Sequence, residues 1–292
     1  MFSRVLLFRE VKHGVKALKS DKDSRVSELR PPGNPSSHRL VGKASGEQRM
    51  CHFFSFCSDG KGNYLYADWT IRQKILSGKL LNYEPDSHTS IAHLYGFNGE
   101  KEDLLNKYEF NPLTKAFQNQ INTFDDGKDA EIWVRNLDFQ KVCPLLIIKP
   151  IVNPLNLPPR KPIKKDIENL KAWARVWVRV RDNVGAGVWA SVWASVRDSV
   201  GDNIRASVRA SVQTSLRDIA WASVWDSVGA SVRASIWASI RAYSLSFFNI
   251  KYQYDFSPML ALYKRGFVPS YNGERWRLHN GKEGKIVYEG KF

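Results

Sequence analysis

The chain has 292 residues and a formal net charge of +15, with 44 Lys and Arg against 29 Asp and Glu. Three cysteines, Cys51, Cys57 and Cys143, have the spacing of neither a zinc site nor a disulfide framework, which favours a reduced, cytoplasmic setting. No apolar run reaches the ~18–20 residues that cross a bilayer, so we expect no transmembrane segment.

Residues 1–49 are basic and include the proline- and serine-rich run Pro31–Ser37, a composition typical of disorder. Gly46–Arg49 can be encoded by a purine-rich stretch at the distance from Met50 that a bacterial ribosome-binding site would have. We therefore expect Met50 to be the natural start and residues 1–49 to be translated upstream sequence. The alternative is a native, basic, disordered leader.

Residues 50–152 predict a small α+β module, because short aromatic strands alternate with capped helical segments. The expected elements are a hairpin over Cys51–Trp69, helices over Thr70–Ser77 and His88–Tyr95, a second hairpin over Lys107–Ile121, a helix over Asp129–Leu137 and an edge strand over Leu145–Val152. Residues 153–163 form a proline-rich linker, expected to be semi-rigid.

A polar cluster in this module is the candidate for chemistry. Asp86, His88, His93 and Glu109 combine carboxylate and imidazole groups, which serve as metal ligands or as acids and bases. His88 and His93 are five residues apart, however, and do not share a helix face as an i, i+4 pair would. The competing interpretation is that Asp86 and Ser87 cap a helix and that the histidines are structural. We therefore expect no catalytic residue, no metal and no cofactor, and keep an enzyme as an alternative.

Residues 164–249 contain the strongest pattern, an uninterrupted four-residue repeat that runs from Ala174 to Ala242. We name its positions a (Ala or Asp), b (mostly Ser), c (apolar, mostly Val or Ile) and d (Trp, Arg or Gly, once Gln). Position c is apolar throughout, which predicts that it is buried. Trp, Arg and Gly differ in volume and charge, and no one packed slot accepts all three.

The variation at position d is what single-base changes among TGG, CGG and GGG codons would produce. We therefore expect position d to face solvent or partners and to form a contact surface. Its candidate residues in the repeat are Trp189, Trp193, Arg197, Arg205, Arg209, Trp221, Trp225 and Trp237. Exposed Trp and Arg are enriched at binding hot spots, which predicts a protein partner or self-association.

Two folds can accommodate a period of four. In an α-helix each unit rotates by about 40°, so short helices keep one apolar stripe. In a β-solenoid, positions a and c would point inward and b and d outward. We favour helices, because Ala and Arg are good helix formers, and keep the solenoid as the alternative.

Residues 250–292 predict a second small α+β module, with a helix over Ser257–Gly266 followed by antiparallel strands. Arg275, Trp276 and Arg277 alternate basic and aromatic side chains, as in surfaces that bind nucleic acid. The competing interpretation places Trp276 in the core of a small sheet, with the arginines in water.

Several segments outside the leader carry a resemblance to a type of protein encoded by bacteriophage and bacterial genomes. They are the Met50–Ser55 opening, Glu84–Ala92, Asn106–Thr114, Leu146–Pro154, the repeat itself and Trp276–His279. The resemblance implies a phage or mobile-element source in a bacterial host cell, and supplies no functional residues. Our leading hypothesis is a non-enzymatic binding or scaffold protein, with nucleic-acid binding through the repeat and the C-terminal strand as the first alternative.

Overall fold

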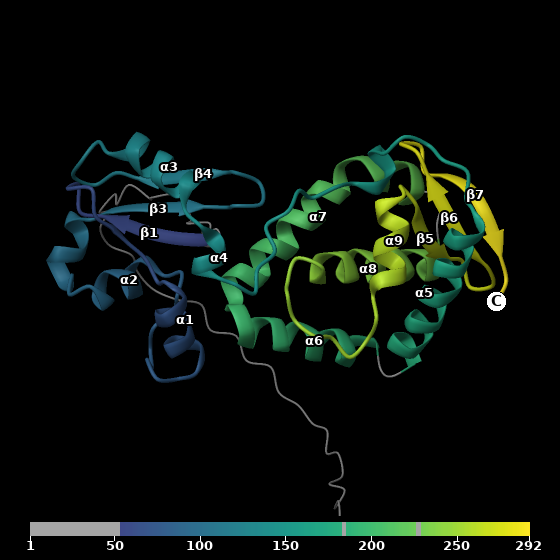
Figure 1. The fold of residues 1–292 in the computed structure, drawn as a ribbon, viewed down its shortest axis with the longest axis horizontal. Coiled ribbons are helices and arrows are strands. Elements are labelled where there is room, and N and C mark those ends of the chain that lie inside the picture. The colour runs from purple at the N-terminus through teal and green to yellow at the C-terminus, as the bar shows by residue number, and fades with distance from the viewer. Residues whose placement is uncertain (1–52, 183–184, 226–228) are drawn as a thin grey trace, which may run out of the picture. The chain divides into compact units, whose positions relative to one another are not determined.

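The structure is a computed structural model that describes residues 53–182, 185–225 and 229–292, without the side chains of residues 181–188 and 217–228. The leader, the expected start at Met50 and the side chains of Trp221 and Trp225 lie outside this description. The described residues form helices and two antiparallel sheets, which agrees with the predicted α+β class (Figure 1).

The first sheet has the strand order β2-β1-β3-β4. Its strands are β1 (Phe54–Ser58), β2 (Tyr64–Leu65), β3 (Asn106–Phe110) and β4 (Phe117–Gln120). Both predicted hairpins are confirmed. The pairing of β1 with β3 joins them, with Phe54 opposite Phe110 and Phe56 opposite Tyr108.

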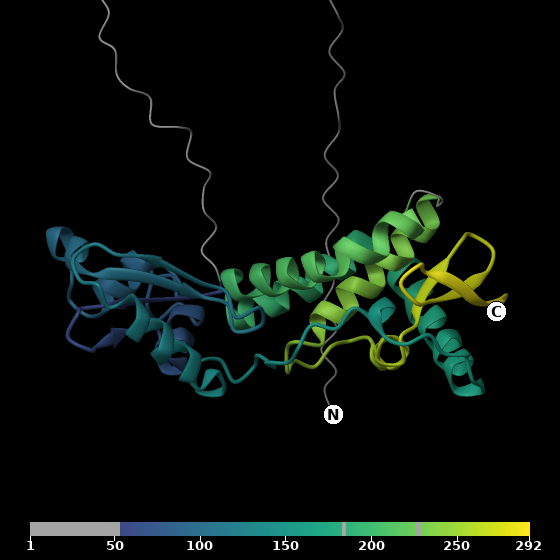
Figure 2. The same cartoon turned by 90° about the horizontal axis from the view of Figure 1, so that it is seen from above.

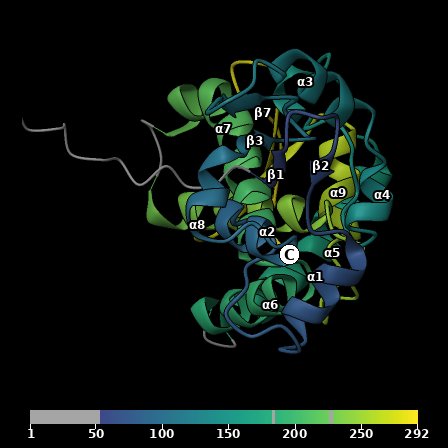
Figure 3. The ribbon, with the colours of Figure 1, turned by 90° about the vertical axis from the view of Figure 1, so that its left-hand side faces the viewer.

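Helices cover both faces of this sheet, which is why all five residues of β1 are buried. On one face, Phe54 and Phe56 pack against Phe139 and Trp133, with ring centroids 5.2 and 4.9 Å apart respectively. On the other face, Cys57 packs against Ile91 of the helix that follows Ser87. Figure 3 shows α3 and α2 on opposite sides of the strands.

Four helices and a 3-10 turn complete this module: α1 (Trp69–Leu76), α2 (His88–Leu94), η1 (Gly99–Leu104), α3 (Gly127–Asn136) and α4 (Phe139–Val142). The three predicted helices are confirmed, and the Ser87 side chain caps α2 as expected. The predicted strand over Leu145–Val152 is wrong. Only an isolated bridge between Leu146 and Phe248 forms there, and Pro150 has no N–H with which to extend it.

The repeat is helical, as predicted, and the solenoid alternative is wrong: no strand occurs in the described part of the tract. The helices are α5 (Lys164–Asp182), α6 (Gly185–Val200), α7 (Asp202–Trp225) and α8 (Ala230–Leu245). No described helix has both the length and the apolar character needed to cross a bilayer.

Where its side chains are described, position c is buried, as predicted, except at the half-buried Val176. The buried members with described side chains are Val180, Val192, Val196, Val200, Ile204, Val208, Val212, Leu216, Val232, Ile236 and Ile240. The described c side chains of any one helix span no more than four units, so a drift of about 40° per unit moves c by about 120° at most, and c stays within the buried face.

Glycine at position d marks the ends of the repeat helices. Gly185 begins α6, Gly201 separates α6 from α7, and Gly229 is the N-cap of α8. Gly201 has a φ of +90°, a left-handed conformation that glycine adopts without steric cost. The glycine variants of the unit therefore divide the tract into separate helices.

Serines at position b tie the tract to its neighbours. Ser207 and Ser211 on α7 accept hydrogen bonds from the Phe53 N–H, at 3.0 Å, and from the Asn111 amide, at 2.9 Å. Ser235 on α8 accepts one from the Tyr271 N–H at 2.9 Å. The polar position of the repeat is thus used in tertiary contacts.

The C-terminal residues pack directly on the tract (Figure 2). They form the predicted helix α9 (Ser257–Lys264) and a three-stranded sheet of β5 (Val268–Tyr271), β6 (Trp276–Asn280) and β7 (Lys285–Gly290). Trp177 of α5 contacts Tyr271 and Trp276, with centroids 5.3 and 5.6 Å apart. The proline-rich segment includes the 3-10 turn η2 (Pro154–Asn156) and also packs here, since the Arg160 N–H donates to Asn280 Oδ1 at 2.8 Å.

Candidate binding groove of the repeat helices

The polar cluster expected from the sequence does not converge into a site, and its Asp86 has a structural role. The Asp86 carboxylate is fully buried and accepts two hydrogen bonds from the Arg72 guanidinium, at 3.0 and 2.5 Å. Arg72 also donates to the Ala67 carbonyl at 2.9 Å. This buried ion pair holds α1 against the start of α2, and only Ser87, not Asp86, caps the helix.

The other members of the cluster are occupied separately. His88 Nε2 lies 3.0 Å from the Tyr108 carbonyl oxygen, and burial lowers the pKa of His88 despite the opposing charges of Glu109 and Asp86. His93 instead faces Glu102, with Nε2 3.7 Å from Oε2. Among the described residues, no group of three or more His, Cys, Asp or Glu side chains could hold a metal ion.

The basic–aromatic strand at the C-terminus follows the competing interpretation in part. Trp276 is buried in the core. Arg277 and Arg275 both pair with Glu289, at 2.5 and 3.4 Å. Their charges are therefore partly neutralised, which weakens the case for nucleic-acid binding by this strand.

The predicted exposure of position d is wrong for the tryptophans whose side chains the structure describes. Trp177, Trp189 and Trp193 are each 6% exposed, and Trp237 is half-buried. The arginines divide: Arg197 and Arg233 are exposed, whereas Arg205, Arg209 and Arg241 are half-buried. Burial follows because the helices of the tract pack on one another, so that much of position d faces a neighbouring helix.

These inward-facing side chains line two adjoining cavities, of about 370 and 550 Å³, that share Trp189, Arg209 and Arg241. We call the pair the d groove. All its lining residues but Val180 occupy position d or position a: Trp177, Trp189, Trp193, Trp237, Arg197, Arg205, Arg209, Arg241, Ala190, Ala194, Ala234, Ala238 and Asp202. The alanines at position a are small, and beside the large side chains at position d they leave open the space that forms the groove.

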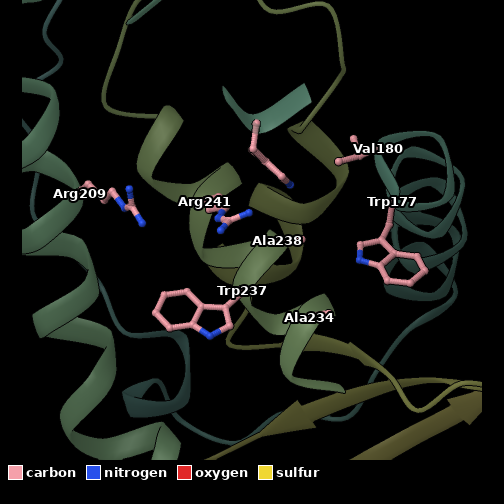
Figure 4. Close-up of a pocket in the computed structure, with 8 residues that line it drawn as sticks. Trp177, Val180, Arg209, Ala234, Trp237, Ala238 and Arg241 are labelled. Atoms are coloured by element: carbon pink, nitrogen blue, oxygen red, sulfur yellow. The ribbon is translucent and has the colours of Figure 1, made fainter. Parts of the chain in front are cut away.

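Two arginines lie near each other in the groove. Arg209 extends from α7 toward Arg241 of α8 (Figure 4), and neither pairs with a carboxylate among the described residues. Burial, and then the charge of Arg209, lower the pKa of Arg241. The guanidinium group nevertheless stays protonated at any physiological pH. Arg197 and Arg205, by contrast, pair with Asp198 and Asp202.

Aromatic rings form the remaining wall. The Trp189 ring stacks on Phe256, with centroids 5.8 Å apart, and the Arg241 Cζ atom lies 5.7 Å from the Trp189 centroid. Trp193 also lines the groove, and its buried indole N–H has no hydrogen-bond acceptor among the residues that the structure describes. The groove therefore combines unpaired positive charge with flat apolar surfaces.

Comparisons with protein-family models, with curated proteins and with solved structures found no match for this chain. We therefore infer the function from the geometry of the groove.

The sequence identified most of this groove but not its shape. Of the eight tryptophans and arginines that line it, six are among the candidates of position d, and Trp177 and Arg241 are additions. Both also occupy position d, so the four-residue period could have identified them as candidates. Which d residues turn toward a common space depends on how the helices pack.

Proposed function

We propose that this chain is a non-enzymatic binding protein and that the d groove binds a small anionic ligand with a flat aromatic ring, a class that includes nucleotides. The observation that carries the proposal is the pair Arg209 and Arg241, which line one cavity close enough to interact and have no carboxylate partner among the described residues. Two like charges in a partly desolvated site destabilise each other, and a bound anion relieves that repulsion.

The chemistry of the wall narrows the ligand further. Arginine donates bidentate hydrogen bonds to phosphate and carboxylate groups, and hydrogen bonds to charged groups contribute about 1.5–3 kcal/mol each. The half-buried Trp237 supplies aromatic surface beside these charges, and Trp189 lines the same cavity. Nucleobases stack on such surfaces with about 1–3 kcal/mol per base. The volumes of the two cavities fall within the range of small-molecule sites.

This geometry changes which of the functional hypotheses from the sequence are best supported. Self-association through exposed tryptophans loses support, because three of the described repeat tryptophans are buried within one chain. Binding of single-stranded nucleic acid uses the same chemistry as binding of a nucleotide, and becomes an outcome of the test. A phage or mobile-element source and a cytoplasmic location in the host stay proposals that depend on the sequence.

Isothermal titration of the full chain with AMP, adenosine and ribose 5-phosphate tests the proposal. AMP is expected to bind at least tenfold more tightly than either fragment, because only AMP engages arginines and aromatic wall together. A short oligodeoxythymidine that binds more tightly than AMP would instead favour a nucleic-acid ligand. Absence of heat with all four compounds at low salt would refute binding in the groove.

A further inference from the structure

A second cavity, separate from the d groove, lies where α8 ends. Its volume is about 940 Å³, and it is enclosed by residues 149–157, the end of α8, the loop 252–257 and α9. We call it the lysine pocket. Its wall is largely aromatic and aliphatic, with Tyr243, Phe248, Tyr252, Phe256, Leu260 and Tyr263 among its lining residues.

One ammonium group is fixed at the edge of this wall. Lys149 Nζ donates to the backbone carbonyl and to the hydroxyl of Ser246, at 2.7 and 2.8 Å, and lies 4.6 Å from the centroid of the Phe247 ring. The segment that carries Lys149 is held in turn by the Ile147 N–H, which donates to the Phe247 carbonyl at 2.8 Å. An ammonium group has three donors, and two are used here.

The charges around Lys149 are unbalanced. Lys264 of α9 lines the same pocket, and neither lysine forms an ion pair with a described carboxylate. Asp255 of the loop is exposed, and its Oδ1 accepts the Ser257 N–H at 2.9 Å. The remaining titratable groups of the wall are tyrosines. Burial, and then the charge of Lys264, lower the pKa of Lys149 to about 8.

We propose that the lysine pocket binds an amphipathic carboxylate of the fatty-acid class, with the carboxylate at Lys149 and Lys264 and the alkyl chain along the aromatic wall. The lining holds two ammonium groups against the single carboxylate of Asp255, with which neither lysine forms an ion pair, so an anion would balance the excess positive charge. An alkyl chain would remove the apolar wall from water, which is the main source of affinity for such ligands. The proposal is independent of the d groove, since the lysine pocket shares no lining residue with either cavity of that groove.

Titration of the full chain with decanoate and with decan-1-ol tests the assignment. At pH 7 decanoate is expected to bind at least tenfold more tightly than the alcohol, and each added methylene is expected to improve affinity by roughly two- to fourfold. The affinity for decanoate, but not for the alcohol, is expected to fall as the pH rises above about 8, because Lys149 loses its proton. Equal affinity for acid and alcohol would overturn the proposal.

Two variants locate the carboxylate. Lys149→Met is expected to abolish the preference for decanoate while binding of the alcohol persists. Lys264→Met, at an exposed position, is expected to reduce the preference several-fold. Lys251→Met, also exposed but absent from the wall, serves as the matched control and should change nothing. A preference for decanoate that survives in both Lys149→Met and Lys264→Met would contradict the assignment.

Discussion

The guanidinium carbon of Arg241 lies 5.7 Å from the ring centroid of Trp189, although both residues occupy position d of the same repeat and come from different helices. Phe256, from outside the repeat, stacks on the same tryptophan at 5.8 Å. Position d is therefore a set of distinct structural sites. Residues that one base change can exchange are not equivalent once the helices have packed.

Substitution of a buried tryptophan at position d is expected to destabilise the fold, as substitution at position c does. Val208 is fully buried, and Val208→Asp should destabilise the fold by several kcal/mol, because an unpaired charge would be buried. Trp193→Ala should cost about 3–5 kcal/mol, as expected for a large core side chain. Arg233→Gln, at an exposed d position, should stay within about ±0.5 kcal/mol. Urea unfolding measures all three, and a neutral Trp193→Ala would show that position d is a surface after all.

The glycines at position d are expected to differ from one another. Gly201 has a φ of +90°, so Gly201→Ser should cost about 1–2 kcal/mol. Gly229 is the N-cap of α8 with a φ of −66° and has open space around it, so Gly229→Ser should be neutral or slightly stabilising. Thermal unfolding of the two variants gives the comparison. Equal effects would mean that Gly201 does not need the left-handed conformation.

The Arg72–Asp86 pair predicts a large effect on stability rather than on binding. Asp86→Asn leaves a buried guanidinium without its counter-charge and should cost about 3–5 kcal/mol. The affinity of the folded fraction for AMP should be unchanged, because neither residue lines the d groove. A variant that keeps wild-type stability but alters binding would return this cluster to consideration as a site.

Acid is expected to weaken the first module through Asp126. Burial alone would raise the pKa of this carboxyl, but hydrogen bonds from Ser58, Tyr108 and Asn106 hold its pKa below the usual value. A depressed folded-state pKa contributes stability above the unfolded value of about 3.9, and that contribution is lost as the pH falls. Asp126→Asn should therefore lower stability at pH 7 and flatten its decline below pH 4. An unchanged slope would exclude Asp126 as a source of acid sensitivity.

Local patterns predicted most of the elements, because a turn or a cap depends on neighbouring residues. Ser87 at the start of α2 and the turn between β3 and β4 are examples. The strand expected over Leu145–Val152 failed because its only bridge partner, Phe248, lies about a hundred residues away and Pro150 interrupts the run. The periodicity correctly predicted that the described side chains of position c are buried, because a repeat position that is apolar in every unit is stable only in a core.

The groove itself could not be predicted from the period. The differences in volume and charge indicated correctly that Trp, Arg and Gly do not share one packed slot. The exposure that we inferred from codon similarity is wrong for the described tryptophans, because the period does not say which d residues turn inward. That depends on Gly201 and Gly229, which divide the tract into helices, and on the packing of α5, α6, α7 and α8 around a common space.

The central claim is that arginines of position d form an anion site. The gain in affinity that a phosphate group gives to a ligand tests this claim most directly. We compare the affinity ratio of AMP to adenosine in the wild type, in Arg209→Gln/Arg241→Gln and in the matched control Arg233→Gln. The ratio is expected to be at least ten in the wild type and in the control, and to fall close to one in the double variant, because the phosphate has lost both partners. A double variant that keeps the wild-type ratio would contradict the account.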